Sequence, residues 1–181
     1  MLKKTRPLIE TEKKIYMQDF VLAPDEKILI VFKGKNPFKM VETMKFNIKR
    51  IYQVPGKDIK TLHFKWDNTA QVRDFFAKWI ITPKKDKWTK AWIPFIIQGT
   101  VDSKTNLGDF TFIMFPWITT IYTYANSLQK ALWWLYNRYF YYEQRRNYIE
   151  EERKLAFQFR DAIIEQMGMK RRIYNEDREL F

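Results

Sequence analysis

Several residue types that carry chemistry are scarce in this chain of 181 residues. It has no cysteine, one histidine and five glycines, and serine occurs only at positions 103 and 127. The absence of cysteine excludes disulfides, thiolate nucleophiles and cysteine-ligated zinc or iron–sulfur sites. It also favours a cytoplasmic protein, because disulfides are rare in that compartment.

The single histidine, His63, has no obvious catalytic partner. It lies in a predicted strand, while Ser103 and Ser127 occupy predicted turn and helix-cap positions, so a nucleophile–histidine–acid triad has little support. A Gly-x-x-x-x-Gly-Lys phosphate loop is absent. Four aspartates flank strand ends and are interpreted as turn residues rather than metal ligands; they are Asp67, Asp74, Asp102 and Asp109. We therefore expect a protein that is not an enzyme and has no cofactor or metal.

The sequence has few features that predict a signal peptide or a membrane-spanning segment. The start, Met-Leu-Lys-Lys-Thr-Arg-Pro, is charged without a following apolar core, which is unlike a signal peptide. Residues 110–129 contain no charged side chain and are long enough to cross a bilayer, but their threonines and central Pro116 favour a strand. Contact of Trp133 and Trp134 with a membrane surface fits the composition better than a span, because tryptophan prefers the interface.

Aromatic residues, by contrast, are abundant at 18% of the chain. Each ring can bury a large area, so their number indicates a large core, an interaction surface or both. The length suits one well-buried domain and is short for two. We predict a single α+β domain over residues 1–168, followed by a charged C-terminal tail over residues 169–181.

Positive charge is also in excess, and it is unevenly placed. The net charge is +12, with 22 basic and 12 acidic residues in 1–125 but 11 and 9 in 126–181. A positive field attracts nucleic acid, anionic lipid or an acidic protein and distinguishes poorly among them. A lysine-rich surface that serves only solubility is the alternative interpretation.

Hydrophobic patterning predicts strands over 8–22, 28–32, 61–66, 74–81, 88–100 and 109–124. Short turns join the last four strands, which favours antiparallel hairpins. Pro94 and Pro116 are unfavourable in strand centres and suggest bulges or edge positions. A shorter helix is expected after Asn36-Pro37, which form a cap and a first helical position, and it should end near Pro55-Gly56.

A long helix is predicted from Ala125 to Gly168, with a cap at Asn126-Ser127. Its first half, over 132–142, is aromatic or apolar nearly all the way round. Such a segment must contact the rest of the domain, a partner or lipid. One apolar stripe is expected to run along the whole helix, through Leu128, Leu132, Leu135, Tyr139, Tyr142, Ile149, Ala156, Phe159, Ile163 and Met167.

The order of elements predicts an α+β fold: an antiparallel sheet of about five or six strands packed on a long C-terminal helix, with one shorter helix after the first strands. This order resembles the START-like, or helix-grip, architecture, in which a curved sheet wraps the final helix. The resemblance covers residues 8–168 and is carried by Gly99-Thr100-Val101, the turn to Gly108, the strand through Thr119-Thr120 and the helix that follows. The chain differs in having two strands before the first long helix, where the family usually has one.

The resemblance implies a cavity for an apolar ligand between sheet and helix, lined or plugged by the aromatic half of the long helix. It implies no universal catalytic residue.

The strongest functional pattern in the sequence is a ladder of rings and guanidinium groups on the long helix. Trp134, Arg138, Tyr141, Arg145 and Tyr148 recur at spacings of 4, 3, 4 and 3, so they are expected to share a face. Such a face could stack bases and neutralise phosphates of single-stranded nucleic acid. The alternative is that both arginines stack on neighbouring rings of their own chain and cover the core.

Two clusters of basic residues extend the candidate nucleic-acid-binding set. Lys39, Lys45, Lys49 and Arg50 are expected on the outer face of the shorter helix, and Lys84, Lys85, Lys87 and Lys90 on one hairpin. We therefore predict a non-catalytic, basic, RNA- or ribonucleoprotein-associated protein. Two alternatives remain open: a subunit that docks on a protein partner through exposed aromatic residues, and a START-like pocket for an apolar small molecule or lipid.

Overall fold

The computed structural model of the protein describes residues 13–67 and 69–169. The first residues of the predicted strand 8–22, and the predicted tail from residue 170 onward, lie outside the described residues. The described residues form seven strands: β1 (Lys13–Phe20), β2 (Ile28–Lys35), β3 (Lys60–Asp67), β4 (Val72–Ile81), β5 (Thr89–Asp102), β6 (Leu107–Met114) and β7 (Trp117–Tyr124). The helices are α1 (Lys39–Tyr52), the 3₁₀ turn η1 (Gly56–Asp58), and a continuous run of α2 (Ser127–Tyr136), the π-helix η2 (Asn137–Tyr141) and α3 (Tyr142–Gln166).

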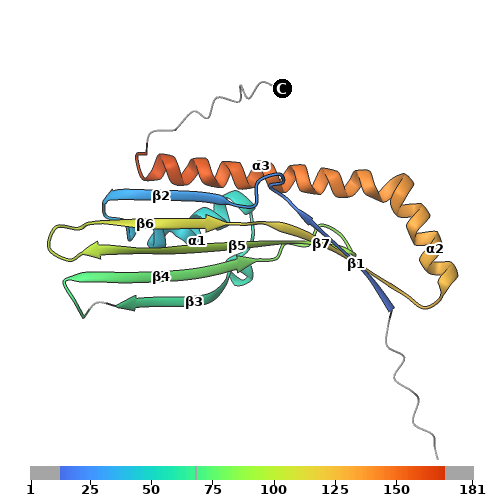
Figure 1. Ribbon diagram of the computed structural model, residues 1–181, viewed down its shortest axis with the longest axis horizontal. Helices are drawn as coiled ribbons and strands as arrows, with labels where there is room; N and C mark the ends of the chain where they lie inside the picture. Colours follow the sequence, from blue (N-terminus) through green and yellow to red (C-terminus); the bar gives the residue numbers. More distant parts are fainter. Residues whose placement is uncertain (1–12, 68, 170–181) are drawn as a thin grey trace, which may run out of the picture.

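All seven strands form one antiparallel sheet in which β5 is the central element. The C-terminal part of β5 pairs with β6, and its N-terminal part pairs with β7. β2 lies beside β6 and β1 lies beside β7, while β4 and β3 complete the opposite side of β5. The sheet is therefore long and narrow, with the long helical run along its length (Figure 1). The predicted α+β class is confirmed, with seven strands instead of five or six.

The extra strand arises at the two prolines. The predicted strand 109–124 is divided into β6 and β7 around Pro116, and the pairing with β5 stops at Phe95–Met114 and resumes at Trp92–Trp117. Pro94 lies in this same interval of β5. Because proline has no N–H to donate, a gap in the pairing accommodates both residues where a continuous ladder would lose hydrogen bonds.

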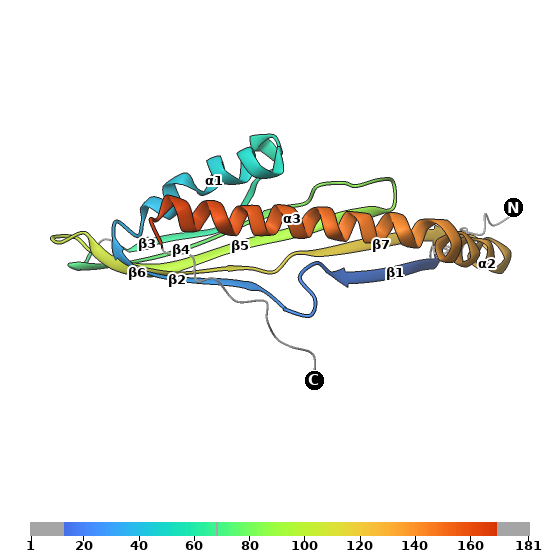
Figure 2. The ribbon, with the colours of Figure 1, turned by 90° about the horizontal axis from the view of Figure 1, so that it is seen from above.

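Helices α1 and α3 pack on the same face of the sheet. The ring of Phe95 in β5 contacts Tyr52 of α1 at a centroid distance of 5.8 Å and Phe159 of α3 at 4.9 Å. Phe159 also contacts Phe112 of β6 at 5.9 Å. Figure 2 shows both helices on one side of the strands. This is a helix-grip-like arrangement, and its core is filled by aromatic rings.

The aromatic half of the long helix does not lie over this core. α2 stands at the end of the molecule, beyond β7 and β1 (Figure 1). The lining or plugging of a central cavity that the START-like resemblance implies is therefore not what α2 does here. The space between α3 and the sheet is occupied by Phe95, Phe112 and Phe159, all fully buried.

The predicted ends of the long helix are confirmed. The side chain of Asn126 accepts a hydrogen bond from the backbone N–H of Gln129, at 2.8 Å, and the Gln129 side chain accepts one from the N–H of Ala125. This reciprocal pair satisfies N–H groups that the helix itself leaves free. At the other end Gly168 adopts φ +62°, which terminates the helix at low cost. The shorter helix begins later than predicted, at Lys39, and Asn36 is not its cap.

The predicted continuous apolar stripe is wrong in the first half of the long helix. Ala156, Phe159 and Ile163 are buried as expected, but the first-half members Leu128, Leu132, Leu135, Tyr139 and Tyr142 are all exposed. The buried stripe there consists of Trp133, Asn137 and Tyr141. η2 adds to the difference, because a π turn contains one residue more than an α turn and so places Trp133 and Asn137, instead of Trp134 and Arg138, in line with Tyr141.

Candidate functional site

The π-helix η2 separates the members of the predicted ladder. Trp134 and Arg138, which precede or begin the π turn, are exposed, whereas Tyr141 and Arg145 are buried at 3% and 7% exposure. Tyr148 is half-buried. The five residues are therefore not displayed together, and the inner members are committed to contacts within the protein.

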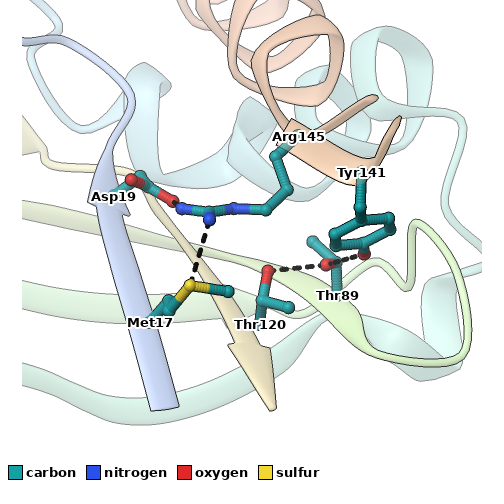
Figure 3. Close-up of polar contacts among 6 residues, drawn as sticks. All are labelled: Met17, Asp19, Thr89, Thr120, Tyr141 and Arg145. Atoms are coloured by element: carbon teal, nitrogen blue, oxygen red, sulfur yellow. Dashed lines mark hydrogen bonds and ion pairs between the residues drawn. The ribbon is translucent and has the colours of Figure 1, made fainter. Parts of the chain in front are cut away.

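Tyr141 belongs to a chain of hydroxyl groups between the helix and the sheet. Its hydroxyl donates to the Asp86 carboxylate at 2.6 Å. The same hydroxyl lies 2.5 Å from Oγ1 of Thr89, which lies 2.7 Å from Oγ1 of Thr120 (Figure 3). Asp86 also accepts from Tyr148 at 3.2 Å. Burial, with the nearby Asp86 carboxylate, raises the pKa of Tyr141. The phenol therefore remains a hydrogen-bond donor that fixes the helix on the β5–β7 junction.

Arg145 is held by β1. Its guanidinium forms an ion pair with Asp19 and lies 3.1 Å from the sulfur of Met17 (Figure 3). Both partners are on the face of β1 that is turned toward the helix. A guanidinium that is buried and paired in this way is a structural cation. Arg145 is thus not placed to meet an external phosphate.

Lys85 likewise forms ion pairs with the long helix. Its ammonium group lies 2.8 Å from a carboxylate oxygen of Glu151 and 2.8 Å from one of Glu152. Burial alone would lower the pKa of Lys85, but the two carboxylates outweigh it and the pKa is raised. The other predicted basic side chains, Lys39, Lys45, Lys49, Arg50, Lys84, Lys87 and Lys90, are exposed.

No protein-family model, curated protein or solved structure matches the chain. Among residues 13–67 and 69–169, no three His, Asp or Glu side chains are grouped to hold a metal ion. No helix within those ranges is long and apolar enough to cross a membrane. His63 is exposed, with its ring 5.4 Å from that of Phe76 in an edge-to-face contact.

The face of the sheet opposite α1 and α3 is the first of two candidate surfaces. Along β5, the buried residues Ile93, Phe95 and Ile97 alternate with Trp92 and Ile96, which point to the other side. Cross-strand pairing extends this second side over the other strands. We call it the open face, since none of the described helices covers it; its main side chains are Tyr16, Phe20, Leu29, Val31, Phe76, Lys78, Ile80, Lys90, Trp92, Ile96, Ile113, Trp117 and Ile121.

Aromatic rings gather on the open face where β6 gives way to β7. Trp92 and Trp117 are stacked, with centroids 6.1 Å apart and planes 3° apart, and Phe115 stacks on Trp117 at 5.9 Å. Phe20 is the register partner of Trp117 and is 61% exposed. The indole N–H of Trp92 donates to Thr119 at 2.8 Å, which fixes the orientation of that ring.

Carboxylates on the open face are confined to one end of the sheet, whereas lysines occur along its whole length. Its strand carboxylates are Asp67, Asp74, Asp102 and Asp109, all at the end where the β3–β4 and β5–β6 turns lie. Toward the β7 end, the described strands place Lys14, Lys60, Lys78 and Lys90 on this face and no outward-pointing carboxylate, while Lys33 and Lys65 lie on it near the aspartates. A local positive field therefore surrounds the stacked rings.

The second candidate surface is the exposed part of α2 and η2, which we call the aromatic end. It comprises Leu128, Leu132, Trp134, Leu135, Tyr136, Tyr139, Phe140 and the adjoining Tyr142, each 44–70% exposed. An open hollow of about 900 Å³ lies beside it, lined by Ala131, Trp134, Leu135, Asn137, Arg138 and Tyr142.

The sequence prediction covered the aromatic end in part, since it named Trp134 and Arg138 and expected the segment 132–142 to need a contact. On the open face it named Lys90 but not Phe20, Trp92 or Trp117, although their alternation with buried residues placed them on one side of predicted strands. The missing information was that both helices cover the same face.

Proposed function

We propose that the protein is a non-catalytic RNA-binding protein on a START-like, helix-grip scaffold, and that it holds single-stranded RNA on the open face of its sheet. The observation that carries this proposal is the Trp92–Trp117–Phe115 stack on an uncovered sheet face, beside exposed lysine. The proposed function is the one predicted from the sequence, but the proposed binding site is the open face of the sheet and not the ladder on the long helix.

Stacking supports a single-stranded ligand. Rings held rigidly on a sheet offer π surfaces to bases that are not paired, and this recognition tolerates any sequence. Phe20, exposed next to the end of the Trp92–Trp117 pair, is the ring best placed to extend the stack with a base. Other exposed apolar residues of this face, among them Leu29 and Val31, add area that water solvates poorly.

Electrostatics support the same site. Lys90 is exposed and Lys78 is partly exposed, and both lie on the open face on either side of the aromatic stack. Phosphate contacts give affinity and salt dependence but little sequence specificity. The expected ligand is therefore a short single strand bound without strong preference for its bases.

The test is fluorescence anisotropy of a labelled 12-nucleotide oligouridine across a salt series. In the variant Lys78→Gln with Lys90→Gln, the slope of log affinity against log salt should fall by roughly 1.4, about 0.7 for each cation lost. Phe20→Ala should weaken binding about tenfold, since stacking of one base is worth about 1–3 kcal/mol.

The matched control is Lys45→Gln with Lys49→Gln on the exposed side of α1, which removes the same charge from another surface. It should leave the slope within about 0.3 of the parent protein. A second control, Arg138→Gln with Arg146→Gln, neutralises the outer cations of the helix. Absence of binding at low salt, or loss of binding only in the helix variant, would overturn the proposal.

A further inference from the structure

We infer that the aromatic end is a second, independent binding site, which enters the headgroup region of an anionic lipid bilayer. The inference does not depend on RNA binding by the open face. It rests on how α2 and η2 are exposed, on their charge and on their place in the molecule.

Exposure of the aromatic end extends around most of the helix. Only Trp133, Asn137 and Tyr141 in the segment 127–141 are buried, at intervals of four residues. Leu128, Leu132 and Phe140 are 70%, 57% and 70% exposed. A protein groove covers one side of a helix, whereas a lipid interface can surround a helix end on several sides. This distribution favours lipid as the occupant.

The types of residue fit the interface rather than the hydrocarbon interior. Leucine and phenylalanine provide apolar anchors, and Trp134, Tyr136, Tyr139 and Tyr142 have the amphipathic rings that prefer the headgroup level. The weakly charged segment 127–142 has 16 residues, which corresponds to roughly 24 Å and is shorter than the roughly 30 Å hydrocarbon layer of a bilayer. The segment can therefore lie in the interface but cannot span the bilayer.

Charge at the aromatic end is complementary to anionic lipid. From residue 110 to residue 142 the chain contains no aspartate or glutamate, while Lys130 and Arg138 are exposed. Each of these cations lies over a ring: Lys130 at 5.7 Å from the Tyr124 centroid and Arg138 at 5.9 Å from that of Tyr139. Long side chains anchored on rings in this way can extend their charge toward headgroup phosphates.

The position of α2 makes insertion geometrically possible. It projects beyond the ends of β7 and β1 at one extremity of the molecule (Figure 1), so the sheet does not block its approach to a planar surface. The buried stripe fixes its direction, because Trp133 stacks on Tyr122 at 4.9 Å and Tyr141 is tied to Asp86.

The experiment is co-sedimentation with vesicles of phosphatidylcholine containing 30% phosphatidylserine, compared with pure phosphatidylcholine vesicles. The parent protein should bind the anionic vesicles, with a blue shift of tryptophan emission that is reduced in Trp134→Phe. The variant Leu128→Ser, Leu132→Ser, Phe140→Ser should bind at least about tenfold more weakly, because three exposed anchors are lost. Its circular dichroism should remain that of the parent protein.

The matched control removes three equally exposed apolar side chains from the open face, as Phe20→Ser, Leu29→Ser, Val31→Ser. It should bind vesicles like the parent protein, while only this control should lose oligouridine. Equal vesicle binding by both triple variants, or absence of binding by the parent protein at low salt, would overturn the inference. It would also be overturned by a stable dimer in sedimentation equilibrium that the α2 variant abolishes, since the occupant would then be a second copy.

Discussion

Glu152 is a buried carboxylate on α3 whose exposed fraction is 1%. Burial raises its pKa, and the neighbouring Lys85 ammonium opposes that increase. Because the pKa is higher in the folded state than in the unfolded chain, ionisation of this group opposes folding. Its contribution to stability therefore declines as the pH rises above the ordinary glutamate range.

Substitution of Lys85 isolates this effect. Lys85→Met leaves Glu152 buried without its cation, so the free energy of unfolding at pH 7 should decrease by about 3 kcal/mol. The loss should be smaller at pH 4, where the carboxyl group is protonated in both states. Urea denaturation at the two pH values measures the difference.

The control for this experiment is Lys84→Met, at an exposed neighbouring position. Its effect should stay within about 0.5 kcal/mol at either pH. A loss of stability in Lys85→Met that is equal at pH 4 and pH 7 would show that the ion pair with Glu152 is not the cause.

Basic side chains that form ion pairs with distant residues explain why individual binding residues are difficult to predict from the sequence. The sequence places Lys85 in a run of lysines, and nothing local distinguishes it from Lys84 or Lys87. Its partner Glu151 is 66 residues away. Similarly, Arg145 pairs with Asp19 across 126 positions, a contact that only the packing of β1 under the helix creates.

The π-helix η2 determines which side of the long helix faces the protein. In an α-helix, each step of four residues advances by about 40° beyond a full turn. The buried residues Trp133, Asn137, Tyr141 and Arg145 follow steps of four three times in succession. The wider π turn offsets this drift and keeps the four side chains against the β5–β7 junction.

Removal of one residue from η2 should therefore be tolerated. Deletion of Arg138 leaves the buried stripe at steps of four, three and four, which an ordinary α-helix presents on one side. We expect the deletion variant to retain its fold and to lose no more than about 1 kcal/mol of stability. Thermal denaturation followed by circular dichroism provides the measurement.

Deletion of Lys154, in the α-helical part of the same helix, is the appropriate comparison. It would rotate Ala156, Phe159 and Ile163 away from the core, and the variant should fail to fold cooperatively. If the two deletions were equally harmful, η2 would not be the element that sets the helix phase.

The error in the predicted stripe arises from the composition of the first half of the long helix. From Leu132 to Tyr142 apolar residues occupy every side of the helix, so hydrophobic periodicity cannot identify the buried one. In the half after Tyr142, charged residues alternate with apolar ones, and there the prediction of Ala156, Phe159 and Ile163 as core residues is confirmed. Strands were predictable for a similar reason, because β4 and β5 show clear alternation.

At the scale of the whole molecule, the two halves of the long helix differ in how much they contact. α3 packs on the sheet and on α1, and the Asn47 side chain of α1 donates a hydrogen bond to the Gln166 side chain of α3. α2, by contrast, contacts the rest of the protein along one narrow buried stripe. Segments with few buried contacts open locally more often than the core does. Hydrogen exchange should therefore be faster in α2 than in the part of α3 around Phe159, by at least about tenfold.

Mass-spectrometric exchange of the free protein and of the protein with anionic vesicles tests this expectation. Vesicles should slow exchange in α2 and leave α3 around Phe159 unchanged. Equal protection of the two segments in the free protein would contradict the picture of a weakly attached helix end.

The central strand β5 belongs to both halves of the sheet, and α3 runs beside it across their junction (Figure 2). Its 14 residues extend for roughly 45 Å, and the 25 residues of α3 for roughly 38 Å. The strand and the helix are therefore of similar length, and a packed core joins them. Contact made by α2 would therefore occur on the order of 40 Å from the turns at the far end of the sheet.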